Sequence, residues 1–386
     1  MRKNFMKKVV AGMLTAVMAF SLTACGGGDA STNDTAKEEG SSDVITVGFS
    51  QVGAESDWRT ANSESMKSTF TKDNGYELIF DDAQQKQENQ ITAIRNFIQQ
   101  DVDYIVLAPV TESGWDTVLQ EAKDAEIPVI IVDRMVDVSD DSLYTTWIGT
   151  DALCEGRKAA EWLNGFAEAK DDSLYTAWVG SNFELEGKKA AAYLKAYAEK
   201  KAMSAPKIVD IQGTIGASAQ IGRTKGLEDA VKAESWNLLE KTTGEFTQAK
   251  GQEVMESFLK KYKKDMDVVY CENDNEAFGA IDAIENAGYK VGADGDMLVF
   301  SFDSTKAGLQ DVKEGKITLD TECNPLHGPR VEKIIEQLEK GETPDKQAYV
   351  DEEMFAHDDT VASVKVDGQD YPVTVVTDEV LKARKY

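Results

Sequence analysis

Short runs of apolar and β-branched residues alternate with amphipathic segments along most of the chain. Four runs lie in the first half, at residues 44–50 (VITVGFS), 76–82 (YELIFDD), 104–110 (YIVLAPV) and 128–134 (PVIIVDR). Because apolar residues follow one another in these runs, the pattern predicts strands that are buried on both faces. The segments between them have helical spacing, as in the stripe of Ile91, Ile94, Phe97 and Ile98.

The same alternation resumes further along the chain. Five more strands are predicted, at residues 207–213, 236–242, 267–273, 297–303 and 317–323. Helices are expected to start near Ser218, Thr247, Asn275 and Ser304. Two blocks of β-α units predict an α/β protein with two doubly wound parallel sheets.

A tandem duplication separates the two blocks. Residues 140–170 and 171–201 are identical at 17 of 31 aligned positions. Two copies are too few for a solenoid, so we interpret each copy as one strand-loop-helix unit. One copy then belongs to the fold and the other is an insertion, and the sequence does not distinguish them.

The first 24 residues have the features of an export signal, with a basic start followed by a short apolar segment. The segment ends in Leu22-Thr23-Ala24-Cys25, which resembles the lipobox of bacterial lipoproteins, so Cys25 is the expected lipidation site. Residues 25–43 are small and polar, which predicts a flexible tether. The sequence therefore predicts a protein that is lipid-anchored on the outer face of the cell membrane.

These patterns also predict the domain limits. The first lobe is expected at 44–136, completed by about 325–355, and the second lobe at 137–322, with 356–386 as a C-terminal extension. The chain has 69 acidic and 42 basic residues, a formal charge of −27, which disfavours a nucleic-acid partner. The three cysteines after Cys25 form no metal-binding pattern, so no metal or cofactor is predicted, although a bridge between Cys271 and Cys323 is conceivable.

Polar and charged residues follow several of the predicted strands. In open parallel sheets, ligands bind beyond the carboxyl ends of the strands, where loops lead into helices. The residues expected there are Glu55, Ser56, Asp57, Trp58, Arg59, Asp133, Arg134, Arg223, Asn273 and Asp303. Carboxylates and guanidinium groups satisfy the accepting and donating roles of a sugar hydroxyl, and an indole stacks on the apolar face of a sugar ring.

Each of these residues also has a purely structural interpretation. Ser56 or Asp57 could cap the following helix, and Trp58 could belong to the core. Asp133 and Arg134 could form a structural ion pair, and Asp303 could be a turn residue. The prediction of a sugar site depends on their occurring together at matching strand ends.

At these residues a resemblance to a known family becomes clear. Residues 47–59 (VGFSQVGAESDWR), 81–98, 107–134, 211–226 and 244–258 resemble the galactofuranose-binding proteins of bacterial sugar ABC transporters, which are similar to ribose- and galactose-binding proteins. The resemblance covers about Ile45 to Gly341, interrupted by the duplication. It implies the type I periplasmic binding fold, with two lobes joined by a hinge that closes on the ligand.

The resemblance also implies partners and a site. The ten residues named above would contact a monosaccharide, and the closed protein, expected to be a monomer, would deliver it to the membrane permease. Asp57 departs from the family, which has glycine in its "ESGWR", and "ENDN" replaces an "HNDD"-like stretch. These departures concern which sugar is bound.

Two other classes of function, an enzyme and a ligand-responsive sensor or regulator, are alternatives to a transport protein. A glycosidase needs two suitably spaced carboxylates, but no pair is evident, and arginines beside the acids are expected to keep their pKa values low. A sugar sensor for a receptor kinase would share this fold and site, whereas a DNA-binding regulator would need a basic helix-turn-helix in place of an export signal. The sequence therefore favours a binding protein over an enzyme.

Overall fold

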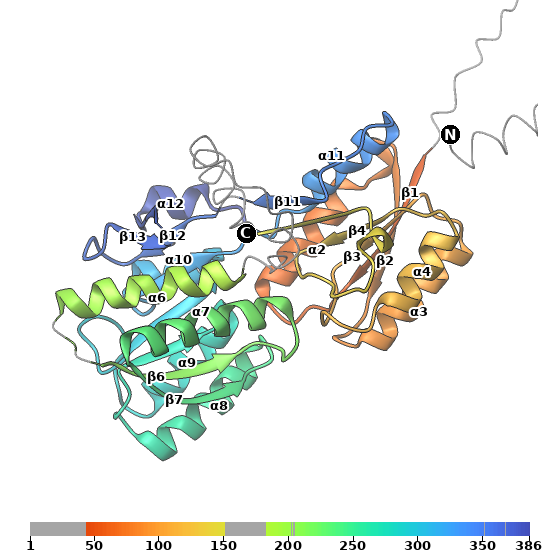
Figure 1. Cartoon of the computed structure of the whole chain (residues 1–386). Helices are drawn as coiled ribbons and strands as arrows, with labels where there is room; N and C mark the ends of the chain where they lie inside the picture. Colours follow the sequence, from red (N-terminus) through yellow and green to blue (C-terminus); the bar gives the residue numbers. More distant parts are fainter. Residues whose placement is uncertain (1–43, 151–182, 202, 204, 351, 367) are drawn as a thin grey trace, which may run out of the picture. The chain divides into compact units, whose positions relative to one another are not determined.

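The computed structural model describes residues 44–150, 183–201, 203, 205–350, 352–366 and 368–386 (Figure 1). The first lobe is built on a six-stranded sheet in which all neighbours are parallel. Its strands, in spatial order, are β11 (Gln347–Val350), β5 (Thr146–Thr150), β4 (Val129–Val132), β3 (Tyr104–Leu107), β1 (Ile45–Gln51) and β2 (Tyr76–Asp82).

Four helices cover this first sheet. They are α2 (Asp57–Thr69), α3 (Gln87–Gln99), α4 (Asp116–Asp124) and α11 (Gly328–Glu339), with short 3-10 helices η1 (Lys72–Asn74) and η2 (Asp141–Leu143). Buried residues of α3 and α4, such as Phe97 and Leu119, form one core cluster. Met66 of α2 and Ile335 of α11 belong to a second. The sheet is thus a central layer with a helical layer on each face.

The second lobe is built on a seven-stranded sheet. Its strands, in spatial order, are β15 (Thr374–Val375), β12 (Met354–Ala356), β10 (Leu319–Glu322), β9 (Leu298–Asp303), β8 (Val268–Cys271), β6 (Lys207–Gln212) and β7 (Asn237–Thr243). Five of them form a parallel β-α sheet, while β12 pairs antiparallel with β10. The prediction of two parallel sheets in an α/β protein is therefore confirmed.

The helices of the second lobe lie on both faces of its sheet. They are α6 (Phe183–Lys200), α7 (Ser218–Glu234), α8 (Gln248–Tyr262), α9 (Asp274–Asn286), α10 (Lys306–Lys313) and α12 (Asp378–Ala383). Met255, Ile284 and Leu309 belong to one core cluster, with α12 contributing Leu381. Tyr193 of α6 and Leu227 of α7 belong to the other. An antiparallel hairpin of β13 (Ser363–Val366) and β14 (Gln369–Pro372) packs its Val364 and Val366 into this second cluster.

Two predicted strands differ from the expectation of burial on both faces. β2 and β7 contain mostly half-buried or exposed residues, because each lies at an edge of its sheet. β3 is shorter than the run 104–110 and ends at Leu107. Pro109 follows closely, and proline has no N–H to donate to a neighbouring strand.

The chain crosses between the lobes at three places. It leaves the first sheet after β5, so the first lobe extends beyond the boundary expected at residue 136. It returns between β10 and α11, and it leaves again between β11 and β12. The segment from 356 onward completes the second lobe through β15, the hairpin and α12 (Figure 1).

The duplication is divided between the two lobes. The first sheet uses the strand of the first copy, β5, whereas the second lobe uses the helix of the second copy, α6. Their counterparts fall in 151–182, outside the described residues. The expectation that one copy belongs to the sheet and the other is an insertion stays a prediction, because the described residues contain only the strand of one copy and the helix of the other.

Helices α6 and α7 lie side by side because glycines allow them to approach closely (Figure 1). A Cβ on Gly222 would lie 2.4 Å from the backbone nitrogen of Glu184. A Cβ on Gly187 would lie 2.5 Å from the backbone oxygen of Arg223. This close approach brings Glu186 on α6 within reach of Arg223 on α7.

Two further sequence expectations bear on the described residues. Cys271 and Cys323 are both buried and neither forms a disulfide, so the conceivable bridge between them is not formed. None of the described helices combines the length and the apolar character that a bilayer crossing requires. The predicted signal, Cys25 and the tether lie outside the described residues.

Candidate functional site

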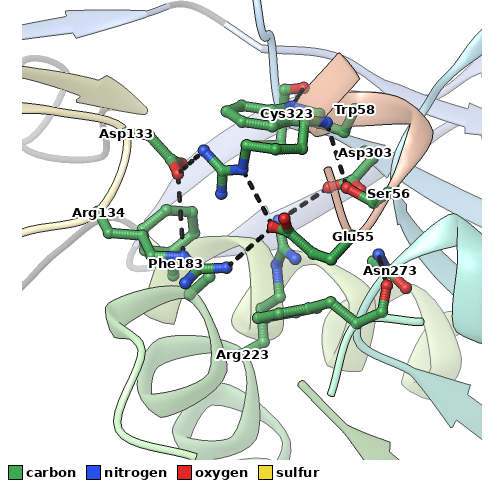
Figure 2. A pocket seen from close by; sticks show the side chains of 13 residues that line it. Glu55, Ser56, Trp58, Asp133, Arg134, Phe183, Arg223, Asn273, Asp303 and Cys323 are labelled. Carbon is green, nitrogen blue, oxygen red and sulfur yellow. Dashed lines mark hydrogen bonds and ion pairs between the residues drawn. The ribbon is translucent and has the colours of Figure 1, made fainter. Parts of the chain in front are cut away.

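A cavity with an empty volume of about 290 Å³ lies where residues of the two lobes meet (Figure 2). Its lining contains nine of the ten residues predicted from the sequence, Asp57 being the exception. The full lining is Glu55, Ser56, Trp58, Arg59, Asp133, Arg134, Phe183, Ala219, Arg223, Phe246, Asn273, Asp303 and Cys323.

The loop between β1 and α2 supplies the first group of lining residues. Ser56 is the N-cap of α2, and its hydroxyl accepts a hydrogen bond from the backbone N–H of Arg59 at 3.1 Å. The cap fixes the start of the helix, so Trp58 and Arg59 project from its first turn. The capping interpretation of Ser56 is correct, and Ser56 lines the cavity as well.

Two arginines and two carboxylates of the first lobe form a buried network. Arg59 Nε lies 3.0 Å from Glu55 Oε1, and Arg59 Nη1 lies 2.8 Å from Asp133 Oδ2. Arg134 Nη2 lies 3.6 Å from the same Glu55 oxygen. Burial alone would raise the pKa of Asp133, but Arg59 and Arg134 hold it below the ordinary value. The first lobe therefore pairs two guanidinium groups with two carboxylates at the cavity.

Two polar atoms of this network have hydrogen-bonding capacity that the described residues do not use. Within the described part of the chain, Glu55 Oε2 and Arg134 Nε make no hydrogen bond although both are buried. Burial and the nearby Arg59 lower the pKa of Arg134 to about 10, so it stays a cation at neutral pH. A buried acceptor and a buried donor without partners are costly unless a ligand satisfies them.

The indole of Trp58 is held in place at the cavity wall. Its Nε1 donates a hydrogen bond to the backbone oxygen of Cys323 at 2.6 Å. The guanidinium of Arg59 lies 4.6 Å from the ring centroid, and His327 packs edge-on at 5.8 Å. The interpretation of Trp58 as a core residue is therefore partly correct, because it is buried and yet lines the cavity.

Arg223 is the central residue of the second lobe's half. Its Nε lies 2.6 Å from Glu186 Oε2, and its Nη2 lies 3.4 Å from Asp303 Oδ1. Burial alone would lower the pKa of Arg223, but Glu186 and Asp303 raise it well above the ordinary value. Burial nevertheless raises the pKa of Asp303 well above its ordinary range. The expectation that arginines keep all site acids at low pKa therefore holds for Asp133 and is wrong for Asp303.

Two strand-end acids have unusual backbone conformations. Asp133 follows β4 with φ of 63°, and Asp303 ends β9 with φ of 105°. L-residues rarely adopt positive φ, and such residues cluster at binding sites, where the surrounding structure maintains the strain. The turns at Asp133 and Asp303 bring both carboxylates into the cavity lining.

Asn273 and Phe246 close the cavity from the second lobe. The Asn273 side-chain oxygen accepts from the backbone N–H of Glu276 at 2.8 Å and so caps α9. Its amide nitrogen donates to the backbone oxygen of Phe246 at 3.1 Å. Arg134 of the first lobe lies 5.2 Å from the Phe246 ring centroid, which is a contact across the cavity.

The structure does not bring Asp57 to the cavity. Asp57 is the first residue of α2 with an exposed side chain, and its backbone N–H donates to the side chain of Asn275 at 3.0 Å. That hydrogen bond joins the two lobes beside the cavity. Asp57 therefore contributes to the contact between lobes through its backbone.

Four lining residues were missed by sequence reasoning: Phe183, Ala219, Phe246 and Cys323. With Trp58 and Ala217 they form a small buried apolar cluster. Phe246 lies in residues 244–258, one of the segments that carry the family resemblance, and this position could have indicated a residue of the site. Phe183 lies in the duplication, where the first copy has Ala152, so the sequence did not identify it.

The lining adjoins a group of side chains of metal-ligand type. Cys323 lies with Glu186 and Glu352 so that one donor atom from each is within 4.8 Å of the others. Glu186 also pairs with Arg223 of the cavity. This group therefore shares Cys323 with the cavity lining.

Comparisons with known proteins identify relatives over most of the chain. Residues 47–321 match the family described as periplasmic binding protein domain. The galactofuranose-binding protein YtfQ of Escherichia coli is 38% identical over 319 residues, covering 81% of this chain and 88% of that protein. The fructose import binding protein FruE of Bifidobacterium longum is 29% identical over 92% of this chain and 95% of its own length.

Solved structures have the same fold. A galactofuranose-binding protein superposes with a TM-score of 0.70 at 36% identity, covering 82% of this chain and 96% of that one. A second solved structure is the binding protein of the Shewanella sp. ANA-3 arabinose ABC transporter with bound α- and β-L-arabinofuranose. It superposes with a TM-score of 0.69 at 38% identity and covers 82% of this chain and 93% of that one. The fold is therefore the type I periplasmic binding fold that the sequence resemblance implied.

Proposed function

Because the chain belongs to the periplasmic binding protein family, we propose that it captures a monosaccharide in the cavity between its lobes and delivers it unaltered to the permease of an ABC transporter. One observation carries the proposal. Two buried charged atoms without hydrogen-bond partners among the described residues, Glu55 Oε2 and Arg134 Nε, belong to residues that line the cavity, and the indole of Trp58 lines it as well. A polyol ring satisfies such an acceptor and donor and covers the indole.

A furanose sugar is the proposed ligand class. Relatives above 35% identity include galactofuranose-binding proteins and two proteins solved with L-arabinofuranose and with β-D-fucofuranose. The cavity of this chain suits a small polyol, because charged groups of both lobes line opposite sides of it. Carboxylates and guanidinium groups in fixed positions discriminate between sugars, since a missing hydroxyl leaves a buried partner unpaired.

Closure of the lobes is the proposed response to the ligand. The described state has contacts across the cleft, including Met135 N to Ser218 Oγ at 3.0 Å and Glu112 N to Gly216 O at 3.1 Å. A ligand that bonds to Glu55 and Arg134 on one side and to Arg223 and Asp303 on the other favours the closed form, because only that form satisfies both sides.

The proposed location is the outer face of the cell membrane, with Cys25 as a lipid anchor. The proposal rests on the signal-like residues 1–24 and the polar tether in the sequence. A lipid anchor would keep the binding protein close to its permease. A sugar-sensing role shares the same cavity, and loss of sugar uptake in a deletion strain would distinguish transport from sensing.

Calorimetric titration of the purified protein with a panel of furanosides and pyranosides tests the proposal. We expect one ring to bind per chain, with methyl furanosides preferred over the matching pyranosides. Chromatography of the recovered sugar checks that it is unaltered, which is important because Asp303 has the raised pKa of a possible proton donor. Absence of binding across the panel, or conversion of the sugar, would contradict the proposal.

A further inference from the structure

Two of the connections between the lobes are hydrogen-bonded to each other. The backbone N–H of Glu322, at the end of β10, donates to the backbone oxygen of Glu353 at 2.9 Å. The backbone N–H of Glu353 donates to the Glu322 side chain at 3.0 Å. The backbone N–H of Asn324 donates to Glu352 Oε1 at 2.8 Å. Residues 322–324 and 352–353 therefore form one paired hinge element.

Three potential metal ligands meet at this hinge element. Cys323 belongs to one connection, Glu352 to the other, and Glu186 to the helix α6 that begins the second lobe after the remaining crossing. Their donor atoms lie within 4.8 Å of one another. Bonds of about 2.0–2.2 Å to oxygen and ~2.3 Å to sulfur, arranged tetrahedrally, place two donors roughly 3.3–3.7 Å apart around one ion. Small side-chain movements are therefore enough to bring all three to one cation.

An independent observation also points to a ligand at this place. Glu186 is 2% exposed, and its Oε1 has no hydrogen-bond partner among the described residues. Arg223 binds the other oxygen, Oε2, at 2.6 Å, so the guanidinium does not satisfy Oε1. A carboxylate oxygen that is buried without a partner is unfavourable. A cation shared with Cys323 and Glu352 would satisfy it.

We propose that Glu186, Cys323 and Glu352 bind a divalent cation of the Zn²⁺ type at the junction of the lobes. Thiolate and carboxylate donors together suit Zn²⁺ and its softer relative Cd²⁺, whereas Ca²⁺ and Mg²⁺ require oxygen donors. Binding replaces the thiol proton of Cys323, which leaves to solvent. The site is separate from sugar recognition, because none of its proposed metal-binding atoms belongs to the sugar contacts proposed above.

The cation would connect the hinge to the sugar cavity. The backbone oxygen of Cys323 accepts the hydrogen bond from Trp58 Nε1, and the two residues lie together in Figure 2. Glu186 orients Arg223 through its second oxygen. A metal that fixes Cys323 and Glu186 would therefore stabilise both the indole and the guanidinium at the cavity wall.

Titration with Cd²⁺ tests the site directly, because a thiolate bound to Cd²⁺ gives an ultraviolet charge-transfer band. The experiment uses the full chain with Cys25→Ser and Cys154→Ser, which leaves Cys271 and Cys323 as the two thiols. We expect the band to saturate at one Cd²⁺ per chain and Zn²⁺ to compete for the same site. Cys323→Ser should abolish the band, and Glu352→Gln should weaken Cd²⁺ binding at least ~10-fold.

Cys271→Ser is the matched control, because Cys271 is an equally buried free thiol in the core of the second lobe. It should leave the band unchanged. Thermal unfolding checks that each variant is folded, and Glu352→Gln provides the test if Cys323→Ser does not fold. A band that does not saturate at one equivalent, that survives Cys323→Ser, or that depends on Cys271 would overturn the proposal.

Discussion

The two halves of the cavity balance their buried charges differently. In the first lobe, Arg59 and Arg134 face Glu55 and Asp133, so two cations match two anions. In the second lobe, Arg223 pairs with both Glu186 and Asp303. Five further acids of the same lobe are completely buried, namely Asp210, Glu272, Asp274, Glu276 and Asp320. One half is therefore charge-matched and the other has an excess of acids.

The two halves compensate their buried carboxylates by different means. A buried carboxylate requires a cation, hydrogen bonds or a proton. Asp133 has cations, and its pKa lies below the ordinary value. Burial, together with Glu272 and Glu276, raises the pKa of Asp210 well above the ordinary value, which favours its neutral form. The first half depends on its arginines, whereas in the second half burial favours neutral carboxyl groups near Arg223.

The largest effect is expected for Arg223→Ala. The substitution leaves Glu186 and Asp303 buried without their cation, which typically costs about 3–5 kcal/mol of the free energy of unfolding. Urea unfolding followed by circular dichroism measures this change. Arg95→Ala is the matched control, because Arg95 pairs with Glu121 at an exposed position, and its stability should barely change. Equal stability of the two variants would mean that the acids of the second half do not require Arg223.

A smaller effect is expected for Arg134→Ala, and it concerns sugar affinity. Arg59 continues to pair with both Glu55 and Asp133, so the first half keeps a cation and the protein should fold. The lost charged hydrogen bonds to the ligand should weaken binding by about 1.5–3 kcal/mol. Trp58→Ala should cost at least ~1 kcal/mol through lost stacking. Calorimetry that finds unchanged affinity in both variants would remove these residues from the site.

The strand-end rule explains why the charged lining could be predicted from the sequence. Buried strands have recognisable apolar runs, and in a parallel sheet the residues after them meet at one edge. Asp133, Arg134 and Asp303 were identified in this way. The pattern did not predict how each side chain points within the first helical turn, so Ser56 and Trp58 reach the cavity whereas Asp57 is exposed.

The rest of the lining depends on tertiary contacts that have no local signal. Cys323 lies where the chain leaves the second sheet, and it becomes part of the cavity because Trp58 binds its backbone oxygen. Phe183 and Glu186 lie on α6, and two nearly equal copies of that helix are present in the sequence. The excess of buried acids in the second lobe was also not predicted, because Asp210 and Glu276 look like surface residues of a very acidic protein.

A pH dependence should distinguish the two halves. Burial raises the pKa of Glu272 from 4.5 to about 8, although hydrogen bonds from Thr224 and Gly213 favour its charged form. The folded state then binds a proton that the unfolded state releases. Stability from this group is complete below pH 4.5 and is lost as the pH rises to about 8, by at most ~1.4 kcal/mol per pH unit. The contribution of Asp133 to the free energy of unfolding changes with pH in the opposite direction. Because its pKa is lowered in the folded state, this contribution is lost only as the pH falls into the acid range.

Urea unfolding between pH 5 and pH 8.5 tests this sign. Glu272→Gln keeps an acceptor for Thr224 and cannot ionise, so its stability should fall less steeply with pH than that of the wild type. Glu253→Gln serves as the control, because the Glu253 side chain is 71% exposed and should not change the slope. Parallel pH profiles for wild type and Glu272→Gln would show that this carboxyl does not take up a proton on folding.

The smallest effect is expected for removal of one repeat length from the duplication. Deleting 151–181 joins Thr150 directly to Asn182 and retains both β5 and α6, which serve different lobes. Calorimetry should find the sugar affinity unchanged.

Deleting 171–201 is the matched comparison, because it also removes 31 residues but replaces Phe183 of the cavity wall by Ala152. The variant lacking 171–201 should bind the sugar more weakly, and Phe183→Ala should show the same loss of sugar affinity. If the 151–181 deletion alone weakened binding, the removed residues would contribute to the site, and α6 would not suffice to complete the second half.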